Sequence, residues 1–150
     1  MLKWLDIPPV WFAGFVVLAW QQKTHYSMSL TIETPIVSLL GGLLVGAGLV
    51  LIALAFYELR RHRTTVIPHL TASALVTSGI YKRSRNPIYL GDAMILTGLI
   101  LNWDAVLSLP LVPIFVWVIE RRFILPEEDR LRRKFVAHFT RYAQQTRRWV

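Results

Sequence analysis

The sequence predicts an all-α membrane protein with about four transmembrane helices, and three observations support this class. Of its 150 residues, 54% are hydrophobic and 17% are charged, whereas soluble domains average about 45 to 50% apolar and about 25% charged residues. The apolar residues gather in four runs, and the basic residues lie beside those runs. A chain of this length is expected to form one domain, residues 1–150.

The first two apolar runs differ in strength. Residues 7–22 contain an unbroken apolar stretch of only 13 residues, whereas a membrane-spanning helix needs about 20. This run therefore either spans the membrane or lies in its interface. Residues 35–57 carry no charge over 23 residues, and at about 1.5 Å per residue they reach about 34 Å, enough to cross a membrane.

The third and fourth runs, residues 88–103 and 105–123, are separated only by the polar break at residues 102–104. This break is short enough for a turn between two antiparallel helices. Asp92 and Glu120 lie near the outer ends of the expected hairpin. We expect the membrane interface to solvate both carboxylates.

The basic residues give the expected orientation. Four spans place Lys3, residues 58–87 and residues 121–150 on one side, and these hold every Lys and Arg except Lys23. The positive-inside rule makes that side cytosolic, with both termini in the cytosol. The formal charge of +8 is thus interpreted as a topology signal, and no nucleic-acid partner is expected.

A stripe of small residues, Ser38, Gly42 and Gly46, recurs every four residues in the second run. Such a stripe lets another helix approach closely. We favour packing inside the bundle over the alternative, a homodimer through this stripe.

Several site classes are excluded. The chain has no Cys, which excludes disulfides, thiolate metal sites and a cysteine nucleophile. No HExxH, phosphate-binding loop or GxSxG motif occurs, and the four His are scattered singly. We therefore expect no metal site.

Residues 75–91, which lead into the third run, are rich in groups that bind ligands. They offer two glycines for close backbone approach, two tyrosine rings, an arginine fork for a carboxylate, and a proline suited to the first turn of a helix. These residues are Gly79, Gly91, Tyr81, Tyr89, Arg85 and Pro87. The alternative is a juxtamembrane loop that holds lipid phosphates.

A second segment, residues 123–131, leaves the fourth run and carries Glu127, Glu128 and Asp129 directly after Pro126. Acids in a first turn offset the helix dipole, which predicts a new helix here. An acid pair also suits the ammonium group of a ligand.

Together these segments resemble the isoprenylcysteine carboxyl methyltransferase family, a superfamily of integral-membrane enzymes that also takes in phospholipid methyltransferases. The resemblance covers roughly residues 60–150. Its motifs are Arg-Thr-Thr at 63–65, Pro68, Leu-Val-Thr-Ser-Gly-Ile-Tyr at 75–81, Arg-Asn-Pro-x-Tyr-x-Gly at 85–91, Pro-Glu-Glu-x-x-Leu at 126–131, the aromatic residues Phe135, Phe139 and Tyr142, and Arg-Arg-Trp at 147–149. Asn86 stands where eukaryotic members have His, Val136 where relatives have Gly, and Phe139 where they have Tyr.

The resemblance implies an S-adenosylmethionine site at the cytosolic face, made from the loop and the C-terminal helical tail. It divides the chain into an N-terminal helix pair, residues 1–59, and a catalytic region, residues 60–150. It implies that Glu127 and Glu128 bind the cofactor's ammonium. The expected lining of the cofactor is Leu75, Val76, Gly79, Tyr81, Arg85, Asn86, Pro87, Tyr89 and Gly91.

The methyl acceptor is expected to be the carboxylate or thiol of an isoprenylcysteine-like molecule. A methyl group on a sulfonium needs alignment more than proton chemistry, and Arg121 and Arg122 are the candidates that would orient an anionic acceptor. These arginines equally suit a stop signal for the fourth span. An amine acceptor, as in a phospholipid headgroup methyltransferase, would instead use Asp92 or His69 as a base. The remaining alternative is a non-catalytic protein that binds anionic lipid.

Overall fold

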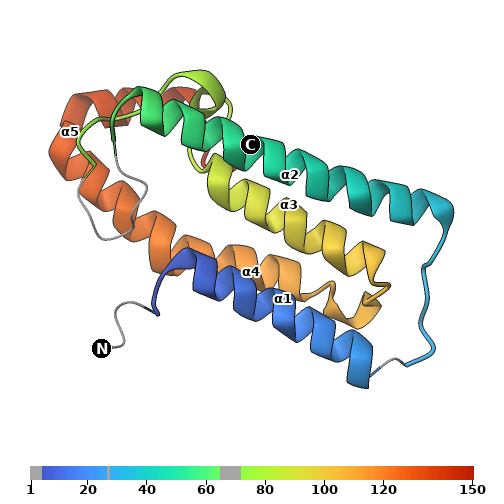
Figure 1. The fold of residues 1–150 in the computed structure, drawn as a ribbon. Coiled ribbons are helices and arrows are strands. Elements are labelled where there is room, and N and C mark those ends of the chain that lie inside the picture. Colours follow the sequence, from blue (N-terminus) through green and yellow to red (C-terminus); the bar gives the residue numbers. More distant parts are fainter. Residues whose placement is uncertain (1–4, 27, 65–71) are drawn as a thin grey trace.

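The computed structural model describes residues 5–26, 28–64 and 72–150, and the fold in these ranges is all-α, as the sequence predicts. Four helices lie side by side, and a fifth extends from one end (Figure 1). The helices are α1 (Pro8–His25), α2 (Pro35–Arg61), α3 (Pro87–Asn102), α4 (Leu111–Ile119) and α5 (Leu125–Gln145). Short 3-10 turns, η2 (Gly79–Lys82) and η3 (Val106–Ser108), precede α3 and α4.

Proline sets the start of the first three helices. Each of α1, α2 and α3 has Pro at its first turn, where the missing N–H would have no helical partner and the fixed φ suits the helix. Thr34 also caps α2, because its Oγ1 accepts a hydrogen bond of 3.2 Å from the Val37 backbone N–H. The predicted place of Pro87 in the first turn of α3 is therefore confirmed.

Helices α2 and α3 meet along two glycine pairs. A Cβ built on Gly48 would lie 2.6 Å from the Gly91 carbonyl oxygen, and one on Gly98 would lie 2.5 Å from that of Gly41. No real Cβ tolerates such distances, so the two backbones touch where side chains would otherwise separate them. We call the pairs Gly41–Gly98 and Gly48–Gly91 the glycine seam.

The seam corrects our preferred interpretation of the small-residue stripe. Ser38, Gly42 and Gly46 are exposed, and a Cβ on either glycine would meet nothing within 4 Å. The stripe therefore lies on the outward face of α2, since α3 occupies the face that carries Gly41 and Gly48. A homodimer through the stripe stays a prediction.

The apolar core lies between α1, α3 and α4. Phe115 of α4 is fully buried, with the rings of Phe12 and Phe15 edge-on to it at centroid distances of 6.1 and 5.3 Å. Leu96 and Ile119 are also fully buried in this cluster. Such edge-to-face aromatic contacts add to the burial of apolar area, and they fix α1 against the hairpin.

The connection from α3 to α4 is longer than the sequence predicts. The chain turns at Trp103, passes through η3, and enters α4 only at Leu111. Asp104, with φ of +53°, accepts a hydrogen bond of 2.9 Å from the Ile32 backbone N–H. The turn is thus tied to the segment before α2, which the apolar pattern alone does not indicate.

The sequence predicts that the fourth helix ends before Pro126 and that a new helix starts there. Instead, α4 continues through a π-helical turn, η4 (Glu120–Ile124), into α5. Pro126 still lies in a first turn, where its missing N–H is tolerated. The helical path breaks later, at Val136, whose φ and ψ are +16° and −91°. Figure 1 shows α5 bending beyond the bundle and turning back toward the segment before α3.

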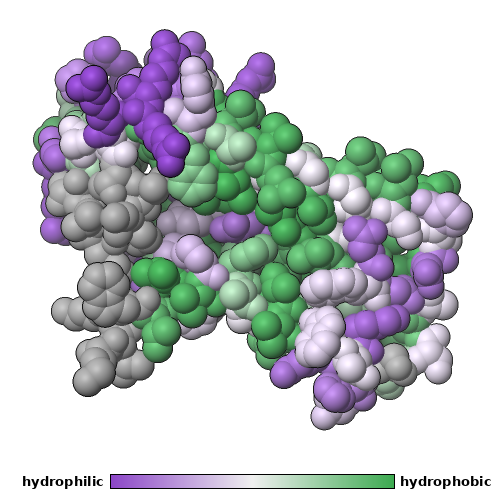
Figure 2. Space-filling view, in the orientation of Figure 1, coloured by the Kyte–Doolittle hydropathy of each residue, from purple (hydrophilic) through white to green (hydrophobic). Residues whose placement is uncertain are grey.

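Among the described helices, α2 is long and apolar enough to cross a membrane, with 27 residues that include an 18-residue stretch of mean hydropathy 2.6. Its outward side chains include Leu39, Leu43 and Leu49, all more than half exposed. Figure 2 shows hydrophobic residues over the middle of the molecule and hydrophilic residues gathered toward its ends. Exposed apolar area of this extent is typical of a lipid-facing surface. Helix α3 is apolar but shorter, and the number of spans stays a prediction.

Candidate active site

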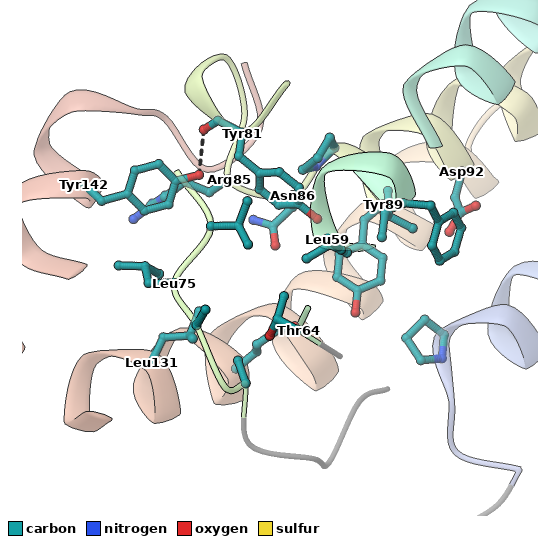
Figure 3. A pocket seen from close by; sticks show the side chains of 18 of the residues that line it. Leu59, Thr64, Leu75, Tyr81, Arg85, Asn86, Tyr89, Asp92, Leu131 and Tyr142 are labelled. Carbon is teal, nitrogen blue, oxygen red and sulfur yellow. Dashed lines mark hydrogen bonds between the residues drawn. The ribbon is translucent and has the colours of Figure 1, made fainter. Parts of the chain in front are cut away.

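A cavity of about 180 Å³ opens where the end of α2, the segment before α3, the start of α3 and the start of α5 converge (Figure 3). In Figure 3, Tyr142 and Asp92 lie at opposite ends of it, with Tyr81 and Tyr89 between them. The described residues that line it include Pro8, Pro9, Phe56, Leu59, Thr64, Leu75, Val76, Tyr81, Arg85, Asn86, Pro87, Ile88, Tyr89, Asp92, Glu127, Leu131 and Tyr142.

Most of the expected cofactor-lining residues do line this cavity. They come from three places in the chain: the segment after residue 72, the start of α3 and the first turn of α5. These are Leu75, Val76, Tyr81, Arg85, Asn86, Pro87, Tyr89 and Glu127. The structure thus brings together residues that the sequence separates by about one third of the chain.

Three of the expected residues have other surroundings. Gly91 packs against α2 in the glycine seam, and Gly79 contacts the side chain of Glu58. Glu128 is buried, with 5% of its surface exposed, and is enclosed by arginines. These positions support the walls of the cavity and are not among its lining residues.

The segment before α3 is held by the C-terminal part of the chain. The Arg85 backbone N–H donates to the Arg147 carbonyl oxygen at 3.0 Å, and the Asn86 side-chain amide donates to the Arg148 carbonyl oxygen at 3.0 Å. The Tyr142 hydroxyl donates to the Tyr81 carbonyl oxygen at 2.6 Å, the bond drawn in Figure 3. The bend at Val136 makes these contacts geometrically accessible, because it returns the end of α5 to the loop.

Glu128 is the centre of an ion-pair network. Arg148 binds it through two parallel hydrogen bonds, from Nε at 3.1 Å and Nη2 at 3.0 Å, and Arg85 Nη2 lies 3.4 Å from the same carboxylate. The remaining Arg148 donor, Nη1, reaches Glu120 at 3.0 Å. The hydrogen bonds to Glu128 raise the pKa of Arg148 above its ordinary value. Glu128 is therefore already neutralised by protein cations.

Glu127, the neighbour of Glu128, faces the cavity. It has no hydrogen-bond or ion-pair partner among the residues that the structure describes. Burial raises its pKa, against a lowering effect of Arg130. Burial also raises the pKa of the Tyr81 hydroxyl, and the nearby Glu127 charge adds to this effect. A partly desolvated carboxylate that no described residue pairs is suited to binding a cationic ligand group.

Two further polar groups in the cavity wall lack partners within the described ranges. They are the Nε of Arg85 and the hydroxyl of Thr64, and both are buried. Buried donors are normally hydrogen-bonded, so each unsatisfied one indicates a place for a ligand atom or a water molecule. The Asp92 carboxylate, at the other end of the cavity, likewise has no hydrogen bond or ion pair to a described residue.

The arginines expected to orient an acceptor lie elsewhere. Both are exposed and absent from the described lining. Arg122 binds Asp6 through Nε at 2.6 Å and Nη2 at 2.9 Å, and its guanidinium lies 5.2 Å from the centre of the Trp11 ring. The structure therefore places Arg122 in contact with the N-terminal end of α1. His69, the alternative base, falls outside the described residues.

The comparison with protein families gives one match. A family model described as phospholipid methyltransferase matches residues 36–138, well over half of the chain. The chain belongs to the phospholipid methyltransferase family. These are membrane-bound enzymes that use S-adenosylmethionine, so the protein is an S-adenosylmethionine-dependent methyltransferase. No curated protein and no solved structure matched the chain.

The polar groups of the cavity fit the amino-acid end of this cofactor. Glu127 is an unpaired carboxylate suited to an ammonium, and the free Nε of Arg85 is a donor suited to a carboxylate. The rings of Tyr81 and Tyr89 offer π faces to a sulfonium or an adenine. The cavity therefore offers an acceptor for the ammonium of the cofactor and a donor for its carboxylate.

Sequence reasoning missed the contributions of the N-terminal half. Pro8 and Pro9 from α1 and Phe56 and Leu59 from α2 form an apolar part of the wall. The run at residues 7–22 was expected to span the membrane or to lie in its interface, the run at residues 35–57 was expected to span it, and neither was assigned to the site. The position of these residues along the chain could have indicated their role, because they lie at the ends of their runs that are expected to be cytosolic.

Proposed function

We propose that this methyltransferase acts on the amine of a lipid headgroup at the cytosolic membrane face, with Asp92 as the group that binds and deprotonates the amine. The observation that carries the proposal is the Asp92 carboxylate, which lines the partly apolar cavity and has no hydrogen bond or ion pair to a described residue. A protonated amine needs such a carboxylate as a base, because its nitrogen has no lone pair to receive a methyl group.

The charges around the cavity favour an amine over a carboxylate or thiolate acceptor. Two carboxylates that lack an ion-pair partner in the described part of the chain, Asp92 and Glu127, belong to the wall. Arg85 is the one cation among the described lining residues, and it is already bound to Glu128. The position of Arg122 beside Asp6 does not support its predicted role in orienting an anionic acceptor.

The lipid character of the acceptor is supported by the apolar residues of the cavity that Asp92 lines. Pro8, Pro9, Phe56 and Ile88 are apolar and come from the ends of three helices. Ligand sites of this kind combine an apolar wall with a few placed polar groups. A headgroup can lie at Asp92 while its acyl chains remain beside the apolar faces of α1 and α2.

S-adenosylmethionine supplies a methyl group already activated by its sulfonium charge, so alignment contributes most to the rate. Glu127 would hold the ammonium of this cofactor, and Arg85 Nε would donate to its carboxylate. Asp92 binds the headgroup ammonium as an ion pair, then accepts one proton from it and leaves the nitrogen lone pair free. The apolar residues exclude water from the same space, which strengthens both charge interactions.

The decisive test follows radiolabelled methyl groups into defined acceptors presented in detergent or vesicles. We expect label in lipids with a primary amine headgroup, and none in isoprenylcysteine carboxylates or thiols. Asp92→Asn should lower the rate at least about hundredfold, as loss of a general base does, while calorimetry gives a cofactor Kd within about threefold of wild type.

Asp129→Asn is the matched control, because Asp129 is an exposed acid on α5. It should retain the wild-type rate. Label found in a carboxylate, together with a large loss of transfer in Arg122→Ala, would restore the anionic-acceptor hypothesis and refute the role of Asp92.

A further inference from the structure

Glu58 is a buried carboxylate at the cytosolic end of α2 to which the function above assigns no role. Only 4% of its surface is exposed. Its neighbours in the last turns of α2, Phe56 and Leu59, line the cavity. One face of the helix end thus forms the wall, while Glu58 points to the segment that carries the cofactor residues.

The contacts of Glu58 reach this segment at Ser78. The Ser78 hydroxyl donates to Glu58 Oε1 at 2.5 Å. Its oxygen also lies 3.3 Å from His62 Nε2, while His62 Nδ1 lies 3.0 Å from the Glu58 backbone carbonyl oxygen. Arg61 Nη1 stands 3.9 Å from the same Oε1. Glu58 is therefore the centre of a small network that joins two turns of α2 to the loop.

Proton counting shows what the network requires. A hydroxyl has one proton to donate, and Ser78 gives it to Glu58. The contact between Ser78 and His62 is then a hydrogen bond only when His62 Nε2 donates. Nδ1 faces the Glu58 carbonyl oxygen, and a neutral ring has one N–H, so such a ring donates either to that oxygen or to Ser78.

Gly79 places the loop backbone directly on the carboxylate. Its φ is +58°, a conformation that favours glycine, and a Cβ built on it would lie 2.6 Å from Glu58 Oε2. Any other residue would push the loop from Glu58. The glycine that the sequence assigned to the cofactor thus contacts the group that holds the loop.

We propose that Glu58 is a positioning residue for the cofactor: through Ser78 and Gly79 it sets the place of Tyr81 and of the Leu75–Val76 wall. The far end of the same segment is held by Tyr142 and the C-terminal backbone. Glu58 supplies the opposite support, from the membrane helix. This proposal rests on the assignment of the cavity to S-adenosylmethionine.

The test compares Ser78→Ala, Glu58→Ala and the double variant with Thr77→Ala, an exposed neighbour, as the matched control. Cofactor Kd is measured by calorimetry, and the order of residues 72–82 by hydrogen–deuterium exchange of the cofactor-free protein. We expect each single variant to weaken binding about tenfold and to speed exchange in that segment. The double variant should bind the cofactor no more weakly than Glu58→Ala does, because the two substitutions remove the same contact, the hydrogen bond between Ser78 and Glu58.

Glu58→Gln keeps the oxygen that accepts from Ser78, so it should bind the cofactor more tightly than Glu58→Ala. A variant that loses thermal stability but keeps the wild-type Kd would show a structural role only and overturn the proposal. Glu127→Gln, measured beside these variants, separates the two assignments. If it leaves Kd unchanged while Ser78→Ala weakens binding, the ammonium-binding role of Glu127 fails and the loop support by Glu58 stands.

Discussion

Arg148 binds both carboxylate oxygens of the buried Glu128, at 3.1 and 3.0 Å, while its backbone carbonyl oxygen accepts the side-chain amide of Asn86. One residue near the end of the chain thus fixes both α5 and the loop before α3. Removing the side chain leaves the Glu128 charge with one ion-pair partner among the described residues, Arg85.

We therefore expect Arg148→Ala to lower the free energy of unfolding by about 3 kcal/mol, since loss of one partner strands a buried charge. Denaturant unfolding in detergent measures this loss. Arg147→Ala is the control, because the Arg147 side chain is exposed and its contact to the loop is made by the backbone carbonyl. Equal stability of both variants would show that the ion pair contributes nothing measurable.

The same substitution, Glu to Gln, should change different properties of the protein at Glu127 and at Glu128. Glu127→Gln removes an unpaired carboxylate, so it should weaken cofactor binding at least about tenfold while stability stays equal or rises. Glu128→Gln should instead lower stability, because the arginine network loses its centre. Calorimetry and thermal unfolding on the same samples test this, and the opposite pattern would exchange the two roles.

The raised pKa of Glu127 predicts opposite pH effects on folding and on binding. Because the folded protein holds this proton at higher pH than the unfolded chain does, its contribution to stability is present at low pH and is lost as pH rises toward the folded pKa. Cofactor binding needs the ionised form, so affinity should fall as pH is lowered through that pKa.

Unfolding and calorimetry across the acidic range check both directions. Glu127→Gln should lose the pH dependence that this group contributes to each. If the variant retains the full wild-type dependence of the cofactor Kd, another group titrates in the site.

The glycine seam predicts that adding one methyl group lowers stability at a glycine of the seam but not at a glycine outside it. Gly48→Ala places a Cβ 2.6 Å from the Gly91 carbonyl oxygen, so the helices must separate, and we expect a loss of about 1 to 3 kcal/mol, as overpacking gives. Gly46→Ala should be neutral or stabilising, because its Cβ meets nothing within 4 Å and Ala is the better helix former. Thermal unfolding of the two variants gives the comparison.

Topology is predicted by the asymmetry of basic residues. Reporter fusions after residues 30, 70, 103 and 150 should give outside, inside, outside and inside signals, respectively. A cytosolic signal after residue 30 would mean that α1 lies in the interface rather than across the membrane.

The sequence predicted the helices better than it predicted their facing surfaces. The charge-free run of α2 is unmistakable, but both of its faces carry small residues, and only the partner decides which face packs. The glycines of α2 and α3 share a seven-residue spacing, 41 to 48 and 91 to 98, and this shared spacing is the sign that could have selected the buried face.

The candidate site was predictable where it is made of consecutive motif residues, and not where it depends on long-range pairs. Glu127 and Glu128 differ by about 100° around a helix, so a site on one side of α5 takes one of them. Which one was not decidable without knowing where Arg148 lies. The pairing of Arg122 with Asp6, at the opposite end of the sequence, was likewise beyond local pattern.

The glycine seam has a further consequence for the reaction, because Gly91 is directly followed by Asp92. The contact of Gly91 with Gly48 fixes the height of Asp92 along helix α2, which is long and apolar enough to be held at one depth in a bilayer. A slip of one helical turn between the two helices would move the carboxylate by about 5.4 Å, from headgroup level toward the acyl chains or the water. Under the proposed function, the seam therefore sets the depth in the bilayer at which a lipid headgroup meets Asp92.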